Sequence, residues 1–208
     1  MFVQGAVTIP AGEPGKLSVV QLGPPSGSLG SSVPVVVRNN TKDELERVEV
    51  NATARDGAGT IIGSGSSQNF EPETLGAGQW GFGYIYFDTA IAADAAIEAT
   101  ASGSEPSSIS NPFDKFPMKV NELQVQQDQY SGPTYLGTVT NPSTTENAED
   151  PISVQVGCFD AESKIQAVHN GFADGTAPPG GTASFSVSSY STSPTCPNIV
   201  VVSSARSL

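Results

Sequence analysis

The sequence of 208 residues has few charged residues, and basic residues are the scarcest among them. Asp, Glu, Lys and Arg make up 14% of the chain, well below the roughly 25% that is usual in soluble globular proteins. Nine basic residues against 21 acidic ones give a formal net charge of −12. Such a charge disfavours the phosphate-binding surface that nucleic acids need, so we expect no nucleic-acid partner.

The chain also has little of what catalysis usually requires. A single histidine and two cysteines leave almost nothing for a zinc cluster or a histidine-based catalytic system. No nucleophile-elbow pattern accompanies His169, which lies in a turn-like sequence and is expected in a solvated loop. We therefore expect no catalytic residue, no metal, no cofactor and no enzymatic activity.

Long apolar runs are missing as well. No segment approaches 18 consecutive apolar residues, so we expect no transmembrane segment. The start of the chain has neither the basic residues nor the apolar stretch of a signal peptide. We expect any signal or anchor to be absent from this chain.

The sequence does contain an internal repeat. An alternating apolar segment ends in Val37-Arg38-Asn39, and another ends in Val139-Thr140-Asn141, 102 residues later. A second such segment ends at Asp56 and again at Asp160. Lys16 to Leu22 matches Lys119 to Val125 at an offset of 103, and we match Phe82 with Phe185 at the same offset. Offsets this constant predict a tandem duplication of one module of roughly 90–100 residues.

The segments in both halves have the two-residue period of β-strands. Each is bounded by Gly, Pro, Asn, Asp or Ser, and each half holds six or seven of them. This predicts an all-β protein of two tandem antiparallel immunoglobulin-like β-sandwiches. Thr89 to Ala101 carries enough alanine to suggest a helix, but the repeat favours a loop and a closing strand at Ala95 to Thr100. Closing strands are expected there and at Ile199 to Ser203.

These strands divide the chain into three expected parts. Residues 1–102 would form the first sandwich together with an N-terminal segment, and residues 115–208 would form the second. Residues 103–114 between them, rich in Pro and Ser, would be an extended linker.

At these positions the sequence resembles the FxLYD domain, a small immunoglobulin-like sandwich of exported or membrane-anchored prokaryotic proteins. The second half carries the pattern in Val139-Thr140-Asn141, Phe159-Asp160, Pro179-Gly180 and Phe185. The first half departs from it at Arg55, where the family has an aromatic residue, and at Ala77, where it has proline. The resemblance implies a non-catalytic module and brings no catalytic residue to this chain.

The motif positions have a structural interpretation. Short amide and carboxylate side chains hydrogen-bond to nearby backbone at strand ends and turns, and glycine permits a positive φ. We expect structural turns at six residues: Asn39, Asp56, Gly78, Asn141, Asp160 and Gly180.

The two cysteines predict a disulfide, with two buried thiols as the alternative. Cys158 falls on the core-facing side of its segment, and Cys196 lies just before the closing strand. A bridge over 38 residues would stabilise the fold by roughly 3–4 kcal/mol. Together with the composition, it favours an extracellular or cell-surface location.

The segment Trp80 to Phe87 has apolar residues on both faces. We assign Trp80, Phe82, Tyr84 and Tyr86 to the core, which leaves Ile85 and Phe87 on the outer face as a possible interface. The other module or another subunit could cover that face. The alternative cover is the N-terminal segment, through Phe2, Val3, Val7 and Ile9.

Two acidic loops complete the set of candidates. Asp43, Glu44 and Glu46 occupy one inter-strand loop of the first half. Glu146, Glu149 and Asp150 occupy the corresponding loop of the second half. Solvated loops are favoured over calcium sites, because the regular spacing of calcium loops is missing.

The sequence as a whole favours a non-catalytic exported structural or interaction module, with a protein partner or self-association. A self-assembling subunit of a filament or virion is one alternative. A carbohydrate-binding module, with Trp80, Tyr130 and Tyr135 as candidate sugar contacts, is another.

Overall fold

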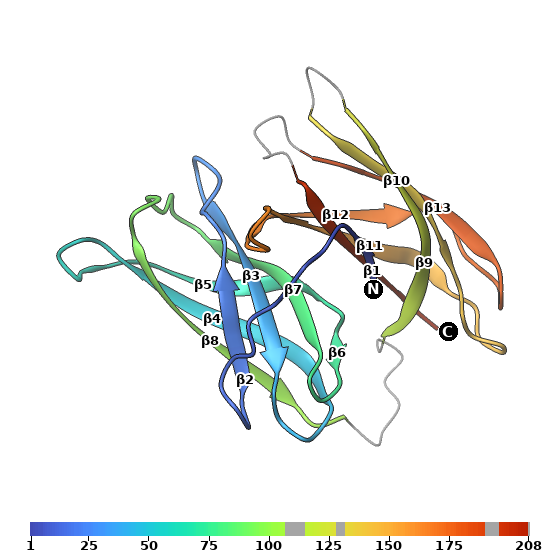
Figure 1. Cartoon of the computed structure of the whole chain (residues 1–208), viewed down its shortest axis with the longest axis horizontal. Helices are drawn as coiled ribbons and strands as arrows, with labels where there is room; N and C mark the ends of the chain where they lie inside the picture. Colours follow the sequence, from blue (N-terminus) through green and yellow to red (C-terminus); the bar gives the residue numbers. More distant parts are fainter. Residues whose placement is uncertain (107–114, 128–131, 190–195, 208) are drawn as a thin grey trace. The chain divides into compact units, whose positions relative to one another are not determined.

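The structure is a computed structural model that describes residues 1–106, 115–127, 132–189 and 196–207. The described chain is built from β-strands, as the two-residue period predicts, and it divides into two compact units (Figure 1). The first module consists of Thr8–Pro106 and includes the short piece Lys164–Ala167. The second module consists of Met1–Val7, Ser107–Ser163 and Val168–Leu208.

The first module is an antiparallel sheet in the order β2-β3-β7-β5-β4, with β6 and β8 also paired to β4. β5 joins its two halves, because its first part pairs with β4 and its last part with β7. The strands are β2 (Leu17–Leu22), β3 (Ser31–Asn39), β4 (Leu45–Arg55), β5 (Ile61–Glu71), β6 (Thr74–Leu75), β7 (Trp80–Phe87) and β8 (Ala96–Ser104). The alanine-rich segment from Thr89 therefore leads into strand β8 rather than a helix, as the repeat indicates.

The second module repeats this arrangement and closes it. Its order is β1-β14-β11-β12-β13-β10-β9, and β9 also pairs with β14, so that the sheet forms a barrel-like ring. The strands are β9 (Lys115–Gln126), β10 (Thr134–Thr140), β11 (Glu149–Phe159), β12 (Ile165–Ala173), β13 (Thr182–Ser188), β14 (Asn198–Arg206) and the short β1 (Phe2–Gln4).

Each module has its own hydrophobic core. The first is built on Val33, Val35 and Val37 of β3 against Val50 and Ala54 of β4. The second is built on the corresponding strands, with Val139 of β10 and Val154 and Val156 of β11 at its centre. The alternation of strand side chains places one face of each strand inward, which is the two-sandwich fold expected from the sequence.

The strand registers repeat between modules. Val37 pairs with Gly81 in the β3–β7 ladder, and Val139 pairs with Ala183 in the β10–β13 ladder, so both strands of this pair recur at an offset of 102. By this register Phe185 corresponds to Gly83. Our match of Phe82 with Phe185 at an offset of 103 was therefore wrong by one residue.

That single residue reverses the faces of β7, because neighbouring strand residues point to opposite sides. Ile85 and Phe87 are fully buried in the core of the first module, so their assignment to an outer interface is corrected. The outer face carries Trp80, Phe82, Tyr84 and Tyr86 instead. Phe82 is fully buried there, and Tyr86 is 44% exposed.

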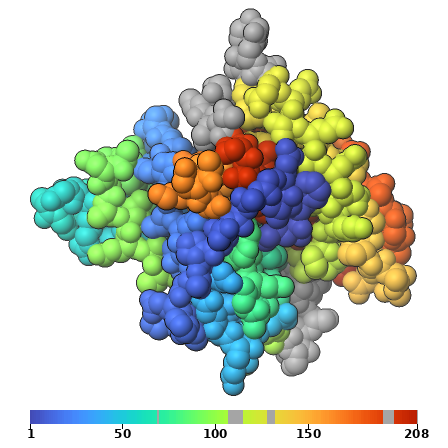
Figure 2. All heavy atoms as spheres, in the orientation of Figure 1, coloured from blue at the N-terminus to red at the C-terminus, as the bar shows by residue number. Residues whose placement is uncertain are grey.

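The N-terminal segment divides between the modules. β1 pairs antiparallel with β14, with Phe2 opposite Val201 and Gln4 opposite Ile199. Figure 2 shows the first residues, in dark blue, against the red residues near the end of the chain. Phe2 and Val3 therefore complete the second module rather than cover β7. Ile9, by contrast, is buried in the first module, where its carbonyl oxygen accepts a hydrogen bond from Arg38 Nη1 at 3.1 Å.

The domain limits follow from this division. Met1–Val7 belongs to the second module, whereas the sequence had suggested that it joins the first. Gly103 and Ser104, expected in the linker, end strand β8. The rest of the expected linker lies largely outside the described residues, and β9 begins at Lys115.

Candidate functional site

Asn39 and Asn141 are fully buried at the ends of β3 and β10. Asn39 Nδ2 donates hydrogen bonds to the carbonyl oxygens of Asp43 and Leu75, both at 2.8 Å. Asn141 Nδ2 donates in the same way to Glu146 at 2.8 Å and Ala177 at 2.9 Å. In the first module the amide thus ties the loop after β3 to the end of β6, and in the second it ties the loop after β10 to the segment before β13.

The other four turn residues also sit in backbone turns. Asp56 Oδ1 accepts from the backbone N–H of Ala58 at 2.9 Å and of Thr60 at 2.8 Å, and Asp160 Oδ1 accepts from Glu162 at 3.0 Å. Gly78 and Gly180 have φ values of 78° and 71°, which side chains rarely tolerate. The hydrogen bonds given above for the asparagines and aspartates all join a side chain to nearby backbone, which supports a structural role.

The predicted disulfide between Cys158 and Cys196 is present. Cys158 is fully buried in β11 and Cys196 precedes β14, so the bridge ties the closing strand to the core. A disulfide indicates a non-reducing setting for the protein.

His169 is not a solvated loop residue. It lies in β12, is 6% exposed, and stacks on the ring of Tyr135 with centroids 5.6 Å apart. Burial lowers the pKa of His169 to about 4 and raises the pKa of Tyr135 to about 12. The hydroxyl of Tyr135 lies 3.3 Å from Cys196 Sγ. The stacked pair of Tyr135 and His169 therefore lies beside the disulfide. With a pKa of about 4, His169 is neutral at neutral pH.

The acidic residues expected in two loops lie partly in strands, with Glu46 in β4 and Glu149 and Asp150 in β11. Asp43, Glu44, Glu146 and Asp150 are exposed, and no three His, Cys, Asp or Glu side chains of the described residues are placed to hold a metal ion. The part of the chain that the structure describes also contains no helix that could cross a membrane.

The feature that sequence reasoning missed is one edge of β8. β8 pairs with β4 along its length, and within the described residues no strand pairs with its other edge (Figure 1). β2 lies near its far end, where a methyl group on Gly103 would stand 3.4 Å from Leu17, but β2 forms no ladder with β8 within the described residues. We call the remaining stretch, Ala96–Thr100, the open edge. An unpaired edge presents free N–H and C=O groups that can pair with another chain.

The open edge also leaves the core partly uncovered. Ile97, Ala99 and Ala101 point toward the core of the first module and pack against it, yet each is only half-buried. In the second module the equivalent closing strand β14 is buried from Asn198 to Ala205. The first module therefore resembles a sandwich that lacks one strand.

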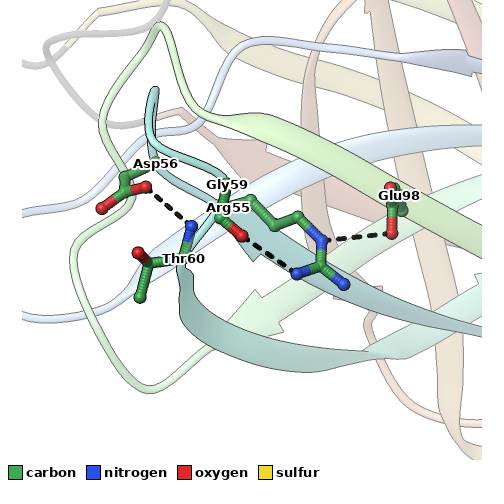
Figure 3. Close-up of polar contacts among 5 residues, drawn as sticks. All are labelled: Arg55, Asp56, Gly59, Thr60 and Glu98. Atoms are coloured by element: carbon green, nitrogen blue, oxygen red, sulfur yellow. Dashed lines mark hydrogen bonds and ion pairs between the residues drawn. The ribbon is translucent and has the colours of Figure 1, made fainter.

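Glu98 is the one charged residue on the open edge. Its carboxylate lies 3.4 Å from Arg55 Nε at the end of β4, and Arg55 Nη1 donates to the Gly59 carbonyl at 3.1 Å (Figure 3). The Glu98 side chain is 70% exposed. Exposed ion pairs of this kind contribute little to stability, so Glu98 can be changed without loss of the fold.

No family model matches the chain, and no curated protein matches it.

Proposed function

We propose that the chain is a non-catalytic structural or interaction module of an exported protein, part of a cell-surface lipoprotein or another surface assembly. The observation that carries the proposal is the open edge of β8, where unpaired backbone adjoins half-exposed Ile97, Ala99 and Ala101. Such an edge can bind a protein by strand addition. The disulfide and the FxLYD-like residues support an exported setting.

Location and thiol state test the proposal together. Cells of the source organism are fractionated, and the protein is treated with an alkylating reagent before and after reduction. We expect it outside the reducing compartment, with both cysteines alkylated only after reduction. Recovery from the cytoplasm with both thiols free would contradict the proposal.

Self-assembly into a filament or virion is the first alternative, because the same edge could pair with another copy. Sedimentation velocity over a wide range of concentration distinguishes the two. Growth into large species with rising concentration favours the self-assembling subunit, whereas a species of 21.4 kDa throughout favours a module that binds a different partner.

Carbohydrate binding is the second alternative. The outer face of β7 carries Trp80, Tyr84 and Tyr86, of which Tyr86 is the most exposed. Tyr135 is 1% exposed and is removed from the candidate sugar contacts, while Tyr130 lies outside the described residues. A glycan array tests carbohydrate binding directly. Binding by the wild-type protein that is lost in Tyr86→Ser would favour this alternative.

A further inference from the structure

We propose that the open edge of β8 receives an extended strand from another polypeptide, uncharged and with a large apolar side chain opposite Ala99. This inference rests on the proposed function and specifies its partner. It follows from a comparison of the two modules, one of which already holds such a strand.

The closing strands correspond residue by residue. Ala54 pairs with Ile97 in the β4–β8 ladder, and Cys158, which occupies the position of Ala54 in the second module, pairs with Ile199. Ile97, Glu98 and Ala99 therefore correspond to Ile199, Val200 and Val201. Those three residues of β14 are the ones that pair with β1, through Gln4, Val3 and Phe2. The stretch of β14 that holds a strand is thus the stretch of β8 that is open.

The added strand has a clear effect in the second module. Phe2 packs against the core, and Ile199 and Val201 beside it are 3% and 0% exposed. In the first module the corresponding Ile97 and Ala99 are half-buried. Alanine at position 99 leaves more space beside the core than the valine at 201, and a large apolar side chain on an incoming strand would fill it. Burying apolar surface of this kind contributes about 25 cal/mol for each Å² removed from water.

Charge also defines the incoming strand. Residues 1–12, which include β1, contain no charged side chain, whereas the whole chain has a net charge of −12. The open edge carries Glu98, so an acidic strand, including a second copy of β8, would place like charges opposite each other. Like charges directly opposite in a ladder are destabilising. An uncharged strand with the pattern of Phe2–Gln4 avoids this cost.

The experiment uses a synthetic peptide with the sequence of Met1–Val7 and cysteine in place of Val3. The edge of β14 is already covered by the tethered β1, so the peptide is directed to β8. In the second module Val3 lies opposite Val200, the equivalent of Glu98. The peptide is mixed with full-length Glu98→Cys protein under mild oxidation, and the mixed disulfide is followed by mass spectrometry.

The control protein is Ser102→Cys. Ser102 is also exposed on β8 but lies outside the open edge. We expect the disulfide with Glu98→Cys to form at least about tenfold faster than with Ser102→Cys, because a paired strand holds the two sulfurs together. We also expect the preference to disappear when the peptide carries Phe2→Asp. Equal rates for the two proteins, or a preference that survives Phe2→Asp, would overturn the proposal.

A second measurement uses the unmodified protein. Addition of the wild-type peptide should slow hydrogen exchange at the backbone amides of Ala96–Thr100, and leave the exchange of β4 unchanged. Protection of these amides by rising protein concentration alone would identify a second copy as the occupant and overturn the proposal. Failure of these tests, with the protein found exported and oxidised, would reject the incoming strand but not the proposed function.

Discussion

Gly137 lies directly opposite Phe185 in the β10–β13 ladder, so close that a methyl group on Gly137 would stand 2.5 Å from the Phe185 ring. The equivalent pair of the first module has the large and small residues exchanged, with Val35 opposite Gly83. The large side chain at this position thus comes from β13 in the second module and from β3 in the first. Because cores are closely packed, the glycine of such a pair is required by its partner.

The first prediction concerns this pair. Gly137→Ala should lower the free energy of unfolding of the second module by about 2 kcal/mol, through overpacking against Phe185 and the carbonyl oxygen of Glu122. Urea unfolding measures it. Gly57→Ala is the matched control, because a methyl group there meets nothing within 4 Å. Equal stabilities of the two variants would show that the contact is relieved at no cost.

The second prediction concerns the buried asparagines. Asn141→Ala removes two donated hydrogen bonds and one that Oδ1 accepts from Ser143 N at 2.9 Å, and should destabilise the second module by about 2–4 kcal/mol. Asn39→Ala should have a similar effect on the first module.

Asn141→Asp separates these hydrogen bonds from side-chain size. A carboxylate of the same shape can accept from Ser143 but cannot donate to the two carbonyl oxygens. Asn141→Asp should therefore be as unstable as Asn141→Ala at neutral pH and recover partly on acidification. A stable Asn141→Asp at neutral pH would argue against the donated bonds.

The third prediction follows from the corrected faces of β7. Ile85→Asp places a carboxylate in the core of the first module and should cost more than about 4 kcal/mol, enough to prevent that module from folding. Circular dichroism and urea unfolding measure it. Tyr86→Ser, on the exposed outer face, should change stability by less than about 1 kcal/mol. If Ile85→Asp altered only association, the original assignment to an interface would be restored.

The fourth prediction is a pH dependence. The pKa of His169 is about 4 in the folded protein, below the ordinary value of 6.5, so the unfolded chain binds a proton more readily between these values. The stability that the neutral histidine contributes is present above about pH 6.5 and is lost as the pH falls toward 4, by up to about 3 kcal/mol.

His169→Phe isolates this contribution, because it keeps an aromatic ring beside Tyr135 and removes the titration. Thermal unfolding of both proteins is compared from pH 7 to pH 4. We expect the wild-type protein to lose more stability than the variant over this range. Parallel curves would mean that His169 has the same pKa in the folded and the unfolded protein, and would contradict the lowered pKa.

The sequence by itself determined the duplication, the strands, the disulfide and the turns. These features depend on residue types at fixed spacing: the two-residue period of the strands, the offset of 102 between Asn39 and Asn141, and the even cysteine count. A strand faces its core with every second residue wherever its partners lie, so its existence can be inferred without them.

Only the tertiary structure decided which face of β7 is buried, where β1 pairs and why His169 is neutral. An alignment error of one residue reverses a strand's two faces, and the residues of β7 are apolar on both, so the pattern could not correct it. β1 is three residues long and pairs with β14, nearly 200 residues away, because backbone pairing needs proximity rather than a local signal. The open edge of β8 is the same kind of property: it depends on which strand is missing beside it, and no residue of β8 encodes that.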